Sequence, residues 1–300
     1  MTRGWPSRTR GVPEAAQPWL FIAPALIAYG AIVVYPTIYS MWLSLHAWDG
    51  MRPTMRFVGL ANYVDLFVGD RVFKVALRNT AIWAVASLLL PTGIGLGLAL
   101  LLNRPFRGRV FFRAVFYLPS ILSLSLTGLI WSWMYHPTLG LLNQLLEAIG
   151  AGRFAVAWLS DPSIALYPVI VAAAWHNAGL PMLLYLAGLQ SVPEEAIEAA
   201  RVDGASRWQV LWHVTLPLLR ETHLVVFAIM MINALKVYDI IYVMTAGGPA
   251  NQTQMLATWM YALTFSFNRI GPGTAIAVLL FGLTLVFAIP YLRSMARRPV

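Results

Sequence analysis

The sequence contains no cysteine and few charged residues. Without cysteine, disulfides, thiol catalysis and cysteine-ligated metal sites are excluded. Charged residues make up 11% of the 300 residues and hydrophobic residues 59%, whereas soluble domains carry roughly a quarter charged residues. The mean hydropathy is +0.68, and the apolar residues form long runs rather than periodic stripes. Since a helix needs about 20 apolar residues to cross the hydrocarbon core, the composition indicates an integral membrane protein.

Lysine is also scarce, because 19 of the 21 basic residues are arginine. The lysines, Lys74 and Lys236, follow phenylalanine and leucine, whereas a phosphate-binding P-loop requires lysine after glycine. The chain is therefore not expected to hydrolyse ATP. The net charge of +9 comes largely from arginines that flank apolar runs, which is typical of topology determinants in a membrane protein. No basic stripe with interleaved aromatic residues occurs, so no nucleic-acid partner is expected.

The apolar runs predict an all-α integral membrane fold with six transmembrane helices. The predicted helices cover residues 19–45, 75–102, 110–134, 164–189, 222–243 and 274–292. The first run is too long for the apolar part of a signal peptide, and no small-residue cleavage site follows it, so it is predicted to be a span. This organisation gives an N-terminal segment 1–18, one transmembrane domain 19–292 and a C-terminal tail 293–300.

The placement of arginine predicts the orientation in the membrane. In a six-span protein both chain ends lie on the same side as the second and fourth loops, and these segments hold 13 of the 21 Lys and Arg residues. Loops rich in Lys and Arg stay on the cytoplasmic side. Both termini are therefore expected in the cytoplasm, and the longer, turn-rich loops 46–74, 135–163 and 244–273 are expected outside.

The fourth loop, residues 190–220, has the pattern of a helix–turn–helix. Ser191 and Glu194 have the spacing of a capping box, and Pro193 lies where the first turn begins. A helix is therefore expected to start there and to include residues 196–202.

Gly204 is placed to end this helix, and Ser206 can cap a second helix that runs to Leu216. Small residues at the bend let another surface approach the backbone, and two carboxylates offer charge to it. The candidate contacts for a partner are Glu198, Ala199, Ala200, Asp203, Gly204 and Ala205. The pattern also fits an interfacial helix that merely connects two spans, although such a helix usually carries Lys or Arg on its polar face and this loop is nearly charge-balanced.

Polar residues within the spans are candidates for a translocation path, because an unpaired ionisable group in hydrocarbon is costly. In the fifth span, Asn233, Lys236 and Asp239 recur at intervals of three, which places neighbours on one helical face. They form either a structural Lys236–Asp239 pair, with Asn233 bonded to another helix, or the lining of the path. Tyr238 and Tyr242 then offer rings on which a sugar can stack, while amides bond its hydroxyls.

The fourth span adds Trp175 and Asn177 to these candidates, on either side of His176. A single histidine without a second ligand nearby is a poor metal site, so no metal is expected, and His176 is assigned either to the path or to an interhelical hydrogen bond. No catalytic residues are expected, because the spans lack convergent histidine or carboxylate pairs. An ion-coupled secondary transporter is predicted to have inverted repeats and paired carboxylates near the midplane, and the sequence has neither.

The stretch Glu198–Ala205, followed by Leu216-Pro217, resembles the EAA signature of permeases of ATP-binding-cassette (ABC) importers. The resemblance to the carbohydrate-uptake (maltose/glycerol-3-phosphate type) subgroup extends over nearly the whole chain. It includes Leu20–Pro24, Tyr35-Pro36, Phe57–Tyr63, Asn79-Thr80, Asn103-Arg104, Leu186–Pro193 and Asp239–Pro249. The sequence departs from the family pattern at Leu211, Val214 and Glu221, which leaves the docking residues intact.

The resemblance implies a sugar importer driven by a separate ATPase. The fourth loop is then the coupling helix that inserts into a cleft of the ATPase, with Glu198 and Asp203 as polar contacts and Gly204 as the bend. The implied partners are a second homologous permease subunit, two copies of a cytoplasmic ATPase subunit that bind ATP and Mg, an extracytoplasmic substrate-binding (lipo)protein, and membrane lipid. This chain itself is expected to hold no cofactor.

The expected location is the plasma (inner) membrane of a prokaryote. A glycerol-3-phosphate-type polyol is the alternative cargo, although an anionic ligand favours an arginine in the path, and Lys236 is the cation that the path offers.

Overall fold

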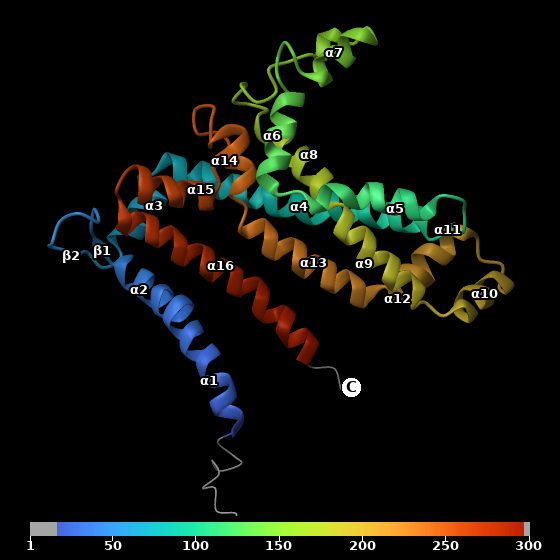
Figure 1. The fold of residues 1–300 in the computed structure, drawn as a ribbon, viewed down its shortest axis with the longest axis horizontal. Helices are drawn as coiled ribbons and strands as arrows, with labels where there is room; N and C mark the ends of the chain where they lie inside the picture. The colour runs from blue at the N-terminus through green and yellow to red at the C-terminus, as the bar shows by residue number, and fades with distance from the viewer. Residues whose placement is uncertain (1–16, 297–300) are drawn as a thin grey trace, which may run out of the picture.

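Long helices give the molecule its length (Figure 1). The computed structural model describes residues 17–296, so residues 1–16 and 297–300 of the predicted terminal segments lie outside the described residues. The long helices are α1 (Gln17–Tyr29), which continues through the π-helical turn η1 (Gly30–Val34) into α2 (Tyr35–Leu43), then α4 (Arg71–Leu102) and α16 (Ile270–Ala296). Each is long and apolar enough to cross a membrane, which confirms the first, second and sixth predicted spans.

The other three predicted spans are broken helices. The first pair is α5 (Arg109–Tyr117), extended by the 3-10 turn η2 (Leu118–Ile121), and α6 (Leu124–Met134), which meet at 99°. The second is α8 (Leu166–Asn177) and α9 (Gly179–Gln190), which meet at 41°. The third bent pair is the run α11 (Arg207–Val210), η4 (Leu211–Thr215) and α12 (Leu216–Leu218), which meets α13 (Arg220–Leu235) at 68°. Only α13 of this pair falls within the predicted fifth span, because residues 207–218 belong to the predicted fourth loop. Six crossings result if each bent pair forms one span.

The continuous helices predicted over 110–134 and 222–243 are therefore wrong. Leu122 is extended, with ψ of 157°, and the Ser123 hydroxyl accepts a hydrogen bond from the amide of Leu126 at 3.2 Å, so α6 has its own N-cap. A cap of this kind satisfies a free helical amide and starts a new helix within the apolar run. In the fifth span the helix ends at Leu235, and residues 236–238 are not helical.

Short elements close the connections at one end of the long helices. A hairpin of β1 (His46–Ala47) and β2 (Arg56–Phe57) precedes α3 (Ala61–Val68). The connection after α14 (Asp239–Thr245) leads to α15 (Leu256–Tyr261) and the π-helical turn η5 (Ala262–Ser266). Asn79 on α4 holds this connection in place, because the buried Asn79 amide donates to the carbonyls of Gln252 at 2.7 Å and Gln254 at 3.0 Å. Trp259 donates to Asp70, the N-cap of α4, at 2.8 Å.

A lobe built around α7 (Leu141–Ala148) and the 3-10 turn η3 (Gly152–Phe154) projects away from the long helices at the top of Figure 1. The buried side chain of Asn143 holds it together. The Asn143 amide donates to the carbonyls of Pro137 at 2.9 Å and Val156 at 3.1 Å, and the indole of Trp158 donates to its oxygen at 2.7 Å. A single side chain thus satisfies backbone groups from both ends of the lobe.

The helix α4 is the centre of the packing, because α9 and α13 both lie against it. Of the three glycines Gly93, Gly95 and Gly97 on α4, only Gly95 closely approaches another helix. A Cβ atom added at Gly95 would lie 2.6 Å from the Cβ of Pro181 and 2.7 Å from the amide nitrogen of Met182, which is too close for either contact. A Cβ atom added at Gly93 or Gly97 would have nothing within 4 Å. Gly95 thus sets the distance between α4 and α9.

Gly95→Ala is expected to destabilise the protein, because the added methyl group forces two backbones apart at a cost of about 1–3 kcal/mol. Gly97→Ala is the matched control. It adds the same methyl group to open space, and Ala is favoured over Gly in a helix by about 1 kcal/mol. The thermal unfolding midpoint of each variant in one detergent measures the difference, and equal midpoints contradict the assigned role of Gly95.

Candidate functional site

The fourth loop begins with helix α10 (Glu194–Val202), but not through the predicted capping box. The N-cap residue is Pro193, whose backbone is extended with ψ of 128°. Ser191 lies two residues before this position, and its hydroxyl donates backward to the carbonyl of Gly188 at 2.8 Å. The predicted start of the helix is confirmed, and the predicted Ser191–Glu194 capping box is wrong.

The bend of the loop follows the sequence prediction. Gly204 has a φ of +84°, in the left-handed region that favours glycine. The amide of Ala205 donates to the carbonyl of Ala200 at 2.9 Å and closes the end of α10. Ser206 and Gln209 then form a capping box, in which Gln209 accepts from the Ser206 amide at 2.8 Å and the Ser206 hydroxyl accepts from the Gln209 amide at 3.3 Å.

The residues predicted to contact a partner form one continuous surface on this loop. Glu198, Ala199, Asp203 and Gly204 are exposed, and Ala200 and Ala205 are half-buried. Within residues 17–296, neither the Glu198 nor the Asp203 carboxylate makes a hydrogen bond or an ion pair to another side chain. Val202 between them is 87% exposed. This surface therefore presents unpaired charge and bare apolar area to its surroundings.

Helices α9 and α13, which lie before and after the loop, contact each other at the base of the loop. Gly188 of α9 packs directly against the hydroxyl of Thr222 on α13, with no room for a Cβ atom between them. One turn further in, the hydroxyl of Tyr185 lies 2.8 Å from Nδ1 of His223, and Tyr185 is fully buried. The loop is thus held on two helices that touch at its base.

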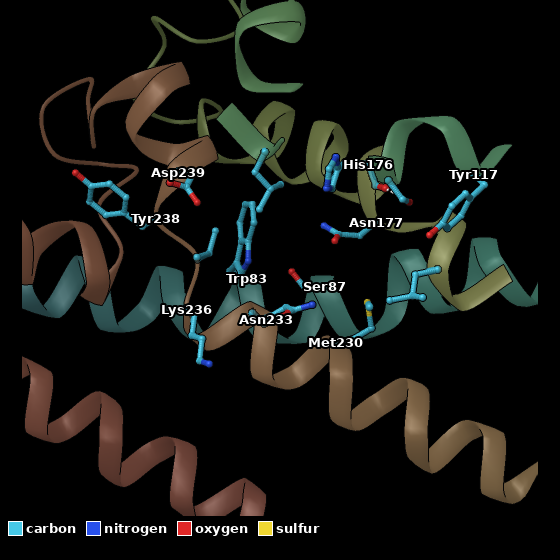
Figure 2. Close-up of a pocket in the computed structure, with 15 residues that line it drawn as sticks. Trp83, Ser87, Tyr117, His176, Asn177, Met230, Asn233, Lys236, Tyr238 and Asp239 are labelled. Atoms are coloured by element: carbon cyan, nitrogen blue, oxygen red, sulfur yellow. Dashed lines mark hydrogen bonds between the residues drawn. The ribbon is translucent and has the colours of Figure 1, made fainter. Parts of the chain in front are cut away.

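The other ends of these helices border a cavity of about 390 Å³ (Figure 2). Five of the seven predicted path residues line it: Asn177, Asn233, Lys236, Tyr238 and Asp239. They come from the end of α8, the end of α13 and the break before α14. The predicted grouping of these residues around one space is thereby observed, although they do not share one helical face.

Trp175 and Tyr242, the other two predicted path residues, do not line this cavity. Trp175 packs edge-on against Trp131 at 5.8 Å between ring centroids. Tyr242 stacks on Tyr238 at 5.2 Å and so supports a lining residue from behind. Both are aromatic residues within a span, and their sequence positions alone do not distinguish a lining side chain from a packed one.

The predicted pairing of Lys236 and Asp239 on one helix is wrong. Lys236 is the C-cap of α13, and Asp239 begins α14 after a non-helical stretch. Among the described residues no ion pair joins them, and Figure 2 shows the two side chains pointing in different directions. Lys236 also borders a second cavity of about 410 Å³, together with Tyr261 and Phe281. Non-helical backbone within a membrane span, such as residues 236–238, is tolerated where it lines a cavity.

His176 makes an interhelical hydrogen bond, which is one of the two roles left open for it, and it also lines the cavity. Its Nδ1 lies 3.0 Å from the hydroxyl of Thr127 on α6. Its carbonyl accepts a hydrogen bond from Ser120 on η2 at 2.6 Å. Within residues 17–296, no group of three His, Asp or Glu side chains is placed to hold a metal ion.

Several lining residues were not identified from the sequence. Trp83 and Ser87 face the cavity from α4, and Tyr117 and Ser120 face it from the end of α5 and from η2. Ser87 and Ser120 are small polar residues inside long apolar runs, which is the signal that a search for intramembrane hydroxyls detects. The cavity thus combines amides, hydroxyls, aromatic rings and one charge of each sign, and it offers hydrogen bonds and ring faces rather than a nucleophile with its base.

Comparison with known proteins gives the family. Residues 90–294 match the family described as the binding-protein-dependent transport system inner membrane component. A probable ABC transporter permease protein of Pyrococcus horikoshii is 39% identical over 94% of this chain and 97% of its own length. The trehalose/maltose transport system permease protein MalF of Thermococcus litoralis is 35% identical over 93% of this chain and 94% of its own length.

A solved structure of a bacterial ABC transporter involved in the import of the acidic polysaccharide alginate superimposes with a TM-score of 0.79. It is 25% identical and covers 96% of this chain and 98% of its own. The chain therefore belongs to the family of binding-protein-dependent transport system inner membrane components, the permeases of ABC importers. Its fold, its apolar helices and its EAA-like loop agree with that membership.

Ser206→Ala is expected to loosen the start of α11, because loss of an N-cap costs about 0.5–2 kcal/mol. Amide hydrogen exchange in residues 207–210 should become faster, while the exchange of α10 stays unchanged. Ser191→Ala is the matched control, since the Ser191 hydroxyl bonds back to Gly188 at the end of α9 and does not cap α10. Faster exchange at the start of α10 in the Ser191 variant contradicts the cap assignment given above.

Proposed function

We propose that this permease moves a sugar or a sugar derivative into the cytoplasm by alternating access, driven by ATP that a separate subunit hydrolyses. The observation that carries the proposal is the connection between the exposed loop surface and the polar cavity through α9 and α13. Gly188 with Thr222 and Tyr185 with His223 hold these helices together below the loop. A displacement of the loop is therefore passed to both helices, which border the cavity through Leu180 on α9 and through Met230 and Asn233 on α13.

The chemistry of the cavity supports a carbohydrate cargo. Amide and hydroxyl side chains bond sugar hydroxyls, and the rings of Trp83, Tyr117 and Tyr238 offer faces for the C–H surface of a sugar. The Thermococcus relative is named for trehalose and maltose, and the solved transporter imports alginate. A glycerol-3-phosphate-type polyol is less well matched, because the lining has one lysine, one aspartate and no arginine.

The proposed assembly contains a second homologous permease, two ATPase subunits that bind ATP and Mg, and an extracytoplasmic binding protein. The sequence has no P-loop lysine, so the chain requires a separate motor. An alginate transporter has been solved in complex with its oligosaccharide-bound periplasmic protein, which supports a binding-protein partner here. In this assembly Glu198 and Asp203 contact the ATPase, the loop is cytoplasmic, and both termini are cytoplasmic in a prokaryotic plasma membrane.

Glu198→Lys is expected to reduce association with the ATPase subunit by about tenfold or more, since hydrogen bonds to charged groups contribute about 1.5–3 kcal/mol. Co-purification of the ATPase with the membrane-inserted permease measures this. Glu147→Lys is the control, because it reverses an equally exposed charge on the lobe around α7.

Unchanged co-purification and transport in the Glu198 variant would rule out the docking role of that residue. Uptake that persists in proteoliposomes when the partner ATPase cannot hydrolyse ATP overturns the proposed energy source.

Asn233→Leu is expected to lower transport of the cognate sugar about fivefold, because it removes one hydrogen-bonding group from the cavity, worth about 1 kcal/mol. Trp175→Phe is the control, since Trp175 does not line the cavity. Uptake in proteoliposomes at saturating binding protein measures both variants. Full transport by the Asn233 variant together with impaired transport by the Trp175 variant places the path elsewhere.

A further inference from the structure

A further and larger cavity, of about 1020 Å³, lies behind the fourth loop. It is bounded by the end of α4, the end of α9 and the inner side of α10 and α11. Figure 1 shows α10 and α11 at one end of the molecule, beyond the end of α9. The contact residues Glu198 and Asp203 are not part of its lining. Of the six residues predicted to contact a partner, only Ala205 lines the cavity, so the cavity is largely separate from the surface assigned to the ATPase.

Three arginines enter this cavity from different elements. Arg104 follows α4, Arg201 lies on α10 and Arg207 begins α11. The lining contains no Asp or Glu, and within residues 17–296 no ion pair or hydrogen bond engages the three guanidinium groups. The Arg113 side chain adds charge behind the wall, since it donates to the carbonyl of Leu102 at 2.8 Å and its buried Nε has no partner among the described residues. The cavity is thus strongly cationic without an internal counterion.

The remaining wall is mostly apolar, and part of it belongs to the last turns of membrane helices. Leu100 and Leu101 on α4 and Leu189 on α9 contribute to it, and Leu101 is 63% exposed. Trp208 also lines the cavity and is 67% exposed, and it packs edge-on against Trp212 at 5.6 Å. Indole rings favour the level of lipid headgroups. Cationic groups, an apolar wall at the end of the spans and indoles at the rim match an anionic amphiphile.

We infer that this cavity binds the anionic headgroup of a membrane phospholipid, with Arg104, Arg201 and Arg207 around the phosphate and the acyl chains along the last turn of α4. Basic pockets between membrane helices bind anionic headgroups in this way. The bound lipid supplies the missing counterions and fills the space between α4 and the loop. The inference concerns a site outside the translocation path and does not rest on the proposed cargo or on ATPase docking.

The test uses the full chain in nanodiscs of phosphatidylcholine that contain increasing fractions of phosphatidylglycerol with brominated acyl chains. Bromine quenches nearby indole fluorescence, and the Trp208 contribution is obtained as the difference from the Trp208→Phe protein. We expect brominated phosphatidylglycerol to quench this difference signal at low fractions, and brominated phosphatidylcholine to do so only in proportion to its bulk abundance.

Arg104→Gln and Arg207→Gln are each expected to raise the fraction for half-quenching about fivefold. Arg109→Gln is the matched control, because Arg109 is an exposed cation close to Arg104 that does not line the cavity. The inference is overturned by equal quenching from both lipids or by an equal shift in the Arg109 variant. Displacement of the lipid by millimolar inorganic phosphate also overturns it, because the site is then one for a free anion.

Discussion

The contact between Gly188 and Thr222 determines how the loop and the membrane helices act together. Because glycine has no side chain, the backbone of α9 approaches the start of α13 closely, and a Cβ atom added at Gly188 would collide with the Thr222 hydroxyl. Leu219, at the junction of α12 and α13, is 1% exposed and fills the same region. The Tyr185–His223 hydrogen bond continues the contact toward the membrane interior. The loop is thereby attached to two helices that contact each other directly as well as through α4.

Helix α4 supplies the fixed frame on which that unit sits. At one end Asn79 holds the connection before α15 by two backbone hydrogen bonds. In its middle Gly95 sets the distance to α9, and near its other end it forms one wall of the arginine-lined cavity. Trp83 and Ser87, between these points, face the polar cavity. One long helix therefore contributes to the walls of both the polar cavity and the arginine-lined cavity.

The sequence predicts the position of apolar helices well, because burial in hydrocarbon requires long runs whatever their tertiary contacts. It also predicts the bend at Gly204 and the cap at Ser206, since a positive φ and an N-cap depend on one or two local residues. The break at Leu122 is not visible in hydropathy, because the residues on both sides remain apolar. The break after Leu235 coincides with Lys236 and Asp239, whose spacing of three also fits one continuous helix. The two breaks depend on a local cap and on neighbouring helices that surround the freed backbone.

The polar part of the candidate site could be predicted from the sequence, because placing a polar side chain in hydrocarbon costs free energy and such residues therefore mark functional positions. That argument identifies Asn177, Asn233, Lys236 and Asp239, which line one cavity. It does not distinguish Tyr238 from Tyr242, because aromatic residues occur both at cavity walls and in packed interiors. The predicted capping box of Ser191 and Glu194 was wrong because spacing alone does not show which partner a hydroxyl bonds. The spacing from Ser191 to Glu194 was correct, but the chain had already used the Ser191 hydroxyl to close the end of α9.

The 99° bend between α5 and α6 makes the protein sensitive to bilayer thickness. Residues 109–121 form a straight segment of about 20 Å at 1.5 Å per residue, against a hydrocarbon core of about 30 Å. α6 turns away toward the lobe in Figure 1 and does not extend this segment. Leu126 and Leu129 on α6 are exposed as well, so a bilayer that covers them with acyl chains must be thicker at this corner than the segment 109–121 alone requires. Such hydrophobic mismatch costs fractions of a kcal/mol per Å, which links the geometry of this corner to the acyl-chain length of the surrounding lipids.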